Sequence, residues 1–363
     1  MSGSPDRSRD GPRGPCTHQT LPYTSQTRLL SAARPYVEEG LARGETVVVV
    51  AADAFLGRLR DLLPEEITDG AGPERIRLVP ADAWYTHPAR TLTTVHDMVA
   101  QARDDGERMR FWGELPWARW SVPQARQWLR YETLLNVMLA GQHVTLCCPV
   151  DLARLRPSVL EGVYAAHPYL VESRRRANPR YQSPERLLRR LNRTRLPDPP
   201  ADVRRIDFDH RDLAEVRRSV AATARSAGLP DDRVFPVVLA VAELAANAVV
   251  HVDGPGRLEV WSSPGELVYQ IRSTGTAPMP PACGFLPPDP LSTTGRGLWM
   301  ARQLADVLEV GICDGDGRGR ADGGRRPRPL RPAPPHPCMG TGCEGMTRPW
   351  PTSRIRSTAG TPS

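Results

Sequence analysis

Apolar and polar positions in the first half of the chain predict buried strands separated by amphipathic helices. Four short apolar runs have the length and composition of strands, at 46–52, 75–80, 107–113 and 143–149. A helix ahead of the first run is predicted by the apolar stripe of Leu29, Leu30, Ala33, Val37 and Leu41. Such an alternation predicts a mostly parallel α/β sheet, whose ligands bind at the carboxyl ends of the strands.

Between residues 205 and 310 the pattern changes to helix, helix, hairpin, loop and helix. The segment 212–227 carries one apolar stripe and ends before a glycine and a proline, and a second helix follows from Asp231. Two stretches, RLEVWSS and ELVYQIRS, then alternate with period two on either side of Pro264-Gly265. This order of elements predicts an α+β layered sandwich.

The second helix carries the segment ELAANAVVH, in which Glu243, Asn247 and His251 share one face at i, i+4 and i+8. Carboxylate and amide oxygens are ligands that Mg²⁺ prefers, although a solvated helix face beside a core has the same spacing. Further on, TTGRGL leads into another helix, with Gly295 and Gly297 at its start. Bare backbone N–H groups at a helix N-terminus attract phosphate, while a lone GRG also fits a tight turn.

Together the two segments resemble the GHKL (Bergerat-type) ATPase fold, and most closely the RsbW-like anti-sigma factors and serine kinases of bacteria. The family pattern ELxxNAxxH is matched by Glu243, Leu244, Asn247, Ala248 and His251. The family turn GRGL is matched by Gly295, Arg296, Gly297 and Leu298. The resemblance covers roughly residues 205–310.

This resemblance implies a site for ATP and Mg²⁺. It implies that Asn247 holds the metal against the triphosphate, with His251 on the same motif. It implies that Glu243 acts as the catalytic base or orients a water, and that the loop from Gly295 to Gly297 wraps the phosphates.

The chain departs from this family at the strand that receives adenine. The family has Asp-x-Gly there, whereas this chain has Ser273, Thr274 and Gly275. A serine hydroxyl accepts a hydrogen bond but brings no charge and a shorter reach than a carboxylate. We therefore expect adenine binding to be weakened or lost.

Three segments of the first half, GELPW at 113–117, YETLLN at 131–136 and CPVD at 148–151, resemble the MEDS sensory domain, which is related in fold to RecA-like ATPases. An early histidine, here His18, is also typical of that domain. The chain departs from the pattern at Leu115 and Val150. It lacks the GxxxxGK[ST] loop, so we expect no nucleotide hydrolysis in this half.

The resemblance implies a sensory pocket built from His18, Glu114 and Trp117. The alternative is structural, with Trp117 as a core or rim aromatic and Glu114 as the cap of a turn. No ligand is identified by these residues.

Composition argues against two classes of function, lysine-dependent catalysis and nucleic-acid binding. The chain of 363 residues has room for two domains, and all 48 of its basic residues are arginine, which excludes any lysine-dependent site. Nine arginines and four acidic residues lie in 311–363, so most of the net charge of +7 belongs to this tail and the body is no obvious nucleic-acid binder. No apolar run reaches the length of a membrane span, so we expect a cytoplasmic protein.

The seven cysteines show no CxxC spacing. We expect neither disulfides nor a metal site near His336, Cys338 and Cys343, because a mobile tail gives no preformed site. Cys147 and Cys148 lie in an apolar strand and are expected to be buried thiols.

The expected organisation is a RecA-like α/β domain, an α+β GHKL domain and a disordered tail. The predicted boundaries are 1–14 disordered, 15–171 MEDS-like, 172–204 an arginine- and proline-rich linker, 205–310 GHKL, and 311–363 disordered or the product of a frameshift. The sheet edge left by a missing closing strand would then be exposed.

The expected function is a regulator of transcription, an anti-sigma-type switch that binds ATP·Mg²⁺ and phosphorylates serine on an anti-sigma antagonist, as a serine/threonine kinase. Its partners would be a sigma factor or that antagonist, without nucleic acid or membrane, and a homodimer is a candidate state. Two alternatives stay open. One is a non-catalytic partner-binding module with a degenerate ATP site, and the other is a histidine-kinase-like transmitter.

Overall fold

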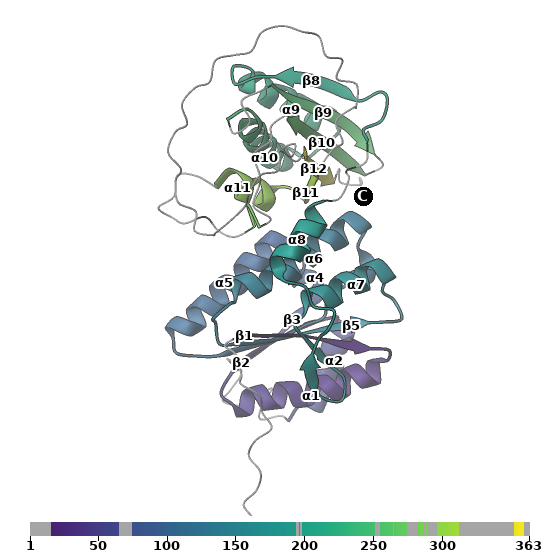
Figure 1. Cartoon of the computed structure of the whole chain (residues 1–363), viewed down its shortest axis with the longest axis vertical. Helices are drawn as coiled ribbons and strands as arrows, with labels where there is room; N and C mark the ends of the chain where they lie inside the picture. The colour runs from purple at the N-terminus through teal and green to yellow at the C-terminus, as the bar shows by residue number, and fades with distance from the viewer. Residues whose placement is uncertain are drawn as a thin grey trace, which may run out of the picture.

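The computed structural model describes residues 16–64, 75–193, 196, 198–250, 255–263, 265–273, 282–285, 288, 296–311 and 352–358. Two sheets, each with its own helices, lie one above the other in Figure 1. The first sheet is rich in parallel pairs and the second is antiparallel, which agrees with the mixed fold expected from the hydrophobic pattern.

The first sheet has seven strands in the order β3-β2-β4-β5-β1-β6-β7. Every neighbouring pair is parallel except β6 with β7. The strands are β1 (Cys16–Tyr23), β2 (Thr46–Ala51), β3 (Ile76–Pro80), β4 (Met109–Gly113), β5 (Val144–Asp151), β6 (Tyr169–Val171) and β7 (Arg175–Ala177). The central β2 and β4 are buried along their whole length, which is why their sequences are continuous apolar runs.

Helices cover both faces of this sheet (Figure 1). One face carries α1 (Gln26–Ala42) and α2 (Asp53–Leu62), whose apolar residues share one core with β2. The other face carries α4 (Ala81–Trp84), α5 (Pro88–Asp104), α6 (Val122–Met138), α7 (Pro157–Ala166) and α8 (Pro184–Asn192). A short 3₁₀ turn, η1 (Trp117–Arg119), leads into α6.

The segment 172–204 is more than the linker that the sequence predicted. Its strand β7 extends the first sheet, and three leucines of α8, Leu187, Leu188 and Leu191, are buried in the core against α6. The leucine spacing places all three on one helix face, while the arginines between them point to solvent. A short helix was expected within this linker, but its packing into the first core was not.

The second sheet has the order β11-β12-β10-β9-β8, and all of its pairs are antiparallel. Its strands are β8 (Arg204–Phe208), β9 (Gly256–Ser263), β10 (Glu266–Ser273), β11 (Val307–Gly311) and β12 (Thr352–Thr358). One face packs against α9 (Leu213–Ser226), α10 (Asp231–Val250) and α11 (Arg296–Leu304). This is the helix, helix, hairpin and helix order that the periodicity predicted.

Strand β12 corrects the prediction of a disordered tail, which is wrong for residues 352–358. The strand lies between β10 and β11, so it fills the position where the sequence predicted an exposed edge. Ile355 is fully buried opposite Tyr269 and Leu308, and Arg356 pairs with Glu266 at 2.7 Å. A single large apolar residue among serines and arginines gives too weak a pattern to stand out from a polar tail.

Helix α10 also contradicts one expectation. By length and hydropathy alone it could cross a membrane, although no apolar run of that length was expected. Its buried residues, among them Val237, Val241 and Leu244, pack in the second core between α9, α11 and the sheet. A core helix of this kind passes the same test, so the finding is weak evidence for a membrane span.

Replacing Ile355 with alanine tests the place of β12 in the sheet. Because the side chain is fully buried, Ile355→Ala should lower the free energy of unfolding by about 2–5 kcal/mol, measured by urea denaturation. The matched control is Val250→Ala, at a position that is 69% exposed, and it should change stability by less than about 0.5 kcal/mol. Equal stability of both variants would mean that β12 is no part of the folded domain.

Candidate functional site

The start of α11 lies against the middle of α10, and this contact gathers three of the predicted site residues. Gly297 is in the first turn of α11, and a Cβ atom added there would overlap the Glu243 carboxylate and lie 3.6 Å from the Asn247 amide nitrogen. Glu243 and Asn247 are one turn apart on α10, and both are half-buried. Glycine at 297 leaves room for the Glu243 carboxylate, which any side chain at this position would displace.

The other predicted residues of this site are placed as follows. Leu298 is buried in the second core and anchors α11, whereas Arg296 is exposed at the first position of the helix. Ser273 ends β10, where it pairs with Gly256 of β9. His251, Gly275 and Gly295 lie outside the described residues.

The arrangement puts a carboxylate and an amide beside the N-terminus of a helix. Backbone N–H groups in the first turn of a helix attract anions, and an amide oxygen such as that of Asn247 is a suitable ligand for a hard cation. A carboxylate at the same point can orient or deprotonate a nucleophile. The residues present therefore fit a metal-bound phosphate, although their roles stay a prediction.

A second candidate site is the cleft at the carboxyl ends of the first-domain strands. It has a volume of about 560 Å³ and takes Tyr23 from β1, Asp151 from β5, and Glu114 and Trp117 from the turn after β4. The cleft lies at the edge of the parallel sheet where ligands bind in folds of this kind. Trp117 is buried and packs edge-on against Trp120 with ring centroids 5.5 Å apart, so it also serves the core.

Glu114 is a half-buried carboxyl group in the lining of this cleft. The Tyr23 hydroxyl donates a short hydrogen bond to its carboxylate. Burial raises the pKa of Glu114 and the nearby charge of Asp151 raises it further, against the effects of Tyr23 and Arg154. A carboxyl with a raised pKa in a cleft is a common feature of ligand sites. Tyr23 and Arg154 were not singled out from the sequence, because only the sheet order brings them to this edge.

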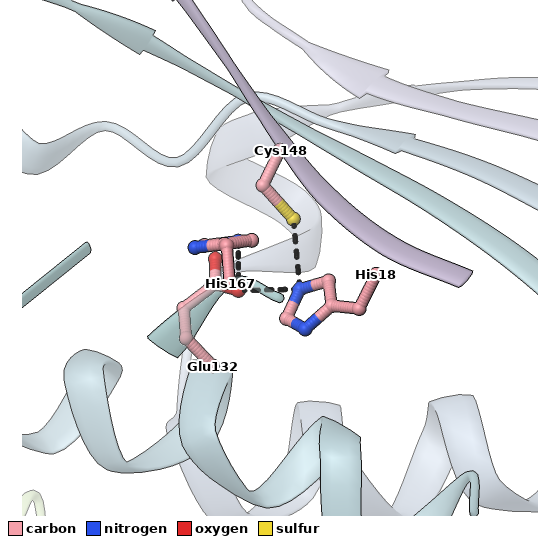
Figure 2. Close-up of side chains that lie close together, drawn as sticks. All are labelled: His18, Glu132, Cys148 and His167. Atoms are coloured by element: carbon pink, nitrogen blue, oxygen red, sulfur yellow. Dashed lines mark hydrogen bonds and ion pairs between the residues drawn. The ribbon is translucent and has the colours of Figure 1, made fainter. Parts of the chain in front are cut away.

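His18 does not join Glu114 and Trp117, although the three were predicted as one pocket. It lies in β1 and contacts Glu132 of α6 and His167, which follows α7 (Figure 2). His18 is not among the residues that line the cleft. Cys148 joins the same buried group, and both Cys147 and Cys148 are buried free thiols, as predicted.

Glu114→Gln tests the burial of this carboxyl. Because its pKa is raised in the folded chain, the wild type binds the extra proton when folded and loses stability as pH rises above about 4.5. The amide has no such proton, so the variant should gain stability relative to the wild type between about pH 4 and about pH 7, measured by urea unfolding. Glu161→Gln, at an exposed position on α7, is the control and should show no such trend. Parallel curves for Glu114→Gln and the wild type would contradict the burial.

The comparisons with known proteins agree with this division of the chain. Residues 17–168 match the family model "MEDS: MEthanogen/methylotroph, DcmR Sensory domain", and residues 206–319 match the model "Histidine kinase-like ATPase domain". No curated protein matches the chain. The second match implies ATP binding, generally with Mg²⁺. The chain is thus similar to a MEDS sensory domain over residues 17–168 and to a histidine kinase-like ATPase domain, consistent with the GHKL type, over residues 206–319.

Proposed function

We propose that this chain is a cytoplasmic switch protein whose ATPase domain acts on a sigma factor or on its antagonist protein, under control of the MEDS domain. The observation that carries the proposal is the contact of Gly297 with Glu243 and Asn247, which places a helix N-terminus beside the two polar groups of α10. In phosphoryl transfer the protein mainly positions groups and neutralises charge, so these residues with Mg²⁺ are sufficient in principle.

Control by the MEDS domain is supported by hydrogen bonds from residues at the start of α5 to the C-terminal end of α11. The guanidinium of Arg90, in the first turn of α5, donates two hydrogen bonds to the Gln303 carbonyl, at 2.6 and 3.0 Å. His87, the N-cap of α5, donates from Nε2 to the Ala305 carbonyl at 2.7 Å. A cation at a helix C-terminus satisfies its last carbonyls and stabilises the helix.

The same helix therefore has the MEDS domain at one end and the Glu243–Asn247 pair at the other. A helix of this length is a rigid element, so a shift of α5 would move or loosen the turn that contains Gly297. A second contact supports the same path, since Arg126 of α6 lies 3.4 Å from Glu309 of β11. We infer that a signal bound in the Glu114 cleft alters the ATP site through α5 and α11.

The segment 172–204 is too short and too interrupted by prolines for the paired-helix module that carries the phosphoacceptor histidine of sensor histidine kinases. This counts against autophosphorylation and favours serine phosphorylation of an antagonist. Ser273 favours the second candidate, a non-catalytic module, because its hydroxyl cannot supply the charge that an aspartate would offer to adenine. In that case partner capture would survive without ATP.

Gly297→Ala tests the phosphate turn. The new methyl group would push against the Glu243 carboxylate, so ATP·Mg²⁺ affinity of the full chain should fall at least about tenfold by calorimetry. Gly57→Ala is the matched control, because that helical glycine has open space around it and the affinity should stay unchanged. Unchanged affinity in the folded Gly297→Ala variant would place ATP elsewhere.

Arg90→Ala tests the coupling between domains. Loss of both hydrogen bonds to Gln303 should loosen α11 and weaken ATP·Mg²⁺ binding by about fivefold, at the lower end of ordinary coupling between sites. Arg103→Ala on the same helix is the control, since its hydrogen bonds go to the adjacent Asp104. Equal affinities for the two variants would show that α5 does not control the site.

The reaction itself is tested with radiolabelled ATP and candidate antagonist proteins. We expect acid-stable phosphate on a serine of the partner, lost in Asn247→Ala. Acid-labile phosphate on a histidine would instead establish the transmitter alternative. Partner binding without ATP binding or label transfer would establish the non-catalytic module.

A further inference from the structure

Four potential metal ligands from four different elements meet between the first sheet and its helices. They are His18 of β1, Glu132 of α6, Cys148 of β5, and His167, which follows α7. Figure 2 shows the two imidazoles beside the Glu132 carboxylate and the Cys148 thiol directed toward the His18 ring. All four residues are buried, and their ligand atoms lie within 4.8 Å of one another.

The distances approach those of a tetrahedral metal site. Oε2 of Glu132 lies 3.1 Å from Nε2 of His18 and 3.2 Å from Nε2 of His167. Sγ of Cys148 lies 3.4 Å from the same His18 nitrogen. Zinc bonds of about 2.0–2.3 Å in tetrahedral geometry give ligand–ligand separations of roughly 3.3–3.6 Å.

Both imidazoles are held so that a bare nitrogen faces the centre. His167 Nδ1 contacts the Val163 carbonyl at 2.7 Å, and because a carbonyl only accepts, this nitrogen carries the proton. His18 Nδ1 contacts Oδ1 of Asn136 at 3.1 Å. The Asn136 amide nitrogen donates to the Ala166 carbonyl at 2.8 Å, which fixes its oxygen toward His18. Metal-bound histidines are oriented by such outer hydrogen bonds.

The cluster is not satisfied by its own hydrogen bonds. Within the described part of the chain, Oε1 of Glu132 and Nε2 of His167 make no hydrogen bond, although both atoms are buried. The His167 nitrogen is close enough to Glu132 for an ion pair but is not angled for a hydrogen bond. Buried polar atoms without partners are uncommon, and a cation at the centre would satisfy the His167 nitrogen.

Charge balance favours a divalent ion. A carboxylate and a thiolate together carry two negative charges, and two neutral imidazoles add none, so a divalent cation makes the buried group neutral. Binding would release the Cys148 thiol proton to solvent. Imidazole, thiolate and carboxylate together form a common donor set for zinc, and four protein ligands are typical of structural rather than catalytic zinc sites.

We propose that His18, Glu132, Cys148 and His167 bind one zinc ion, which fastens α6 and the end of α7 to the central strands β1 and β5. This site is separate from the Glu114 cleft and from the ATP site, so it stands whether or not the proposed switch function holds.

Cobalt(II) provides a direct test, because a tetrahedral cobalt–thiolate site has visible d–d bands and a near-ultraviolet charge-transfer band. The full chain carries Cys338→Ser and Cys343→Ser so that these two thiols cannot contribute, and it is stripped with a chelator before titration. We expect the d–d bands and the charge-transfer band to reach their full intensity at one cobalt per chain. They should disappear when one equivalent of zinc is added. A folded chain that gives no thiolate band would overturn the proposal.

Cys148→Ser and Cys147→Ser are a matched pair on β5. Both thiols are buried, but Cys147 belongs to the core on the other face of the sheet. The charge-transfer band should be lost in Cys148→Ser and retained in Cys147→Ser. The reverse pattern, or a band retained in both variants, would exclude this site.

Asn136→Ala tests the positioning of His18 without removing a ligand. Cobalt affinity should fall about 10- to 100-fold while the band shape is kept, as for other outer-shell changes. Unchanged affinity would show that Asn136 does not orient His18 and that His18 does not bind the metal in the proposed geometry.

Discussion

The burial of helix α6 on nearly all sides is the constraint on which both domains depend. Its central residues from Gln127 to Leu135 are all buried, so their polar side chains are removed from bulk water. Arg130 donates to the Leu191 carbonyl at 2.8 Å and to the Asn192 side chain at 3.0 Å, which ties α8 to the first core. Glu132, two residues on, faces the opposite way, toward His18 and His167. One helix thus fixes the sheet, α7 and α8 relative to one another.

The same helix reaches the second domain. Arg126 is one turn before Arg130 and pairs with Glu309, which Arg356 of β12 also approaches at 3.5 Å. Strand β12 therefore completes the second sheet and supplies part of the charge balance at the boundary between domains. A zinc ion on Glu132 would stiffen α6 at its middle, and that stiffness would extend to the boundary because the two ends of a helix move together. Metal binding and partner regulation would then be linked through one rigid element.

The sequence predicted those features that depend on local periodicity. The apolar runs of β2, β4 and β5 and the motif on α10 were recognised because each is complete within about ten residues. The cluster around Glu132 was not recognised as one site, because His18 and His167 are far apart in the chain and only the parallel sheet order brings them together. Strand β12 was missed because Ile355 is the single large apolar residue in it. Residues that are far apart in the chain and meet only in the folded structure cannot be predicted from a pattern read over about ten residues.

The boundary between the domains contains two buried arginines, Arg302 and Arg130, whose like charges repel each other. Arg302 of α11 is buried there, with its guanidinium 3.6 Å from the centre of the Phe285 ring and one weak hydrogen bond to the Leu308 carbonyl at 3.4 Å. Burial and the nearby charge of Arg130 together lower the pKa of Arg302 to about 9. Two buried guanidinium groups of like charge, one from each domain, weaken the attraction between the domains. The hydrogen bonds from Arg90 and His87 to α11 act against this repulsion. A balance of this kind suits a switch better than a permanent junction, because a modest change in the first domain can shift the position of α11.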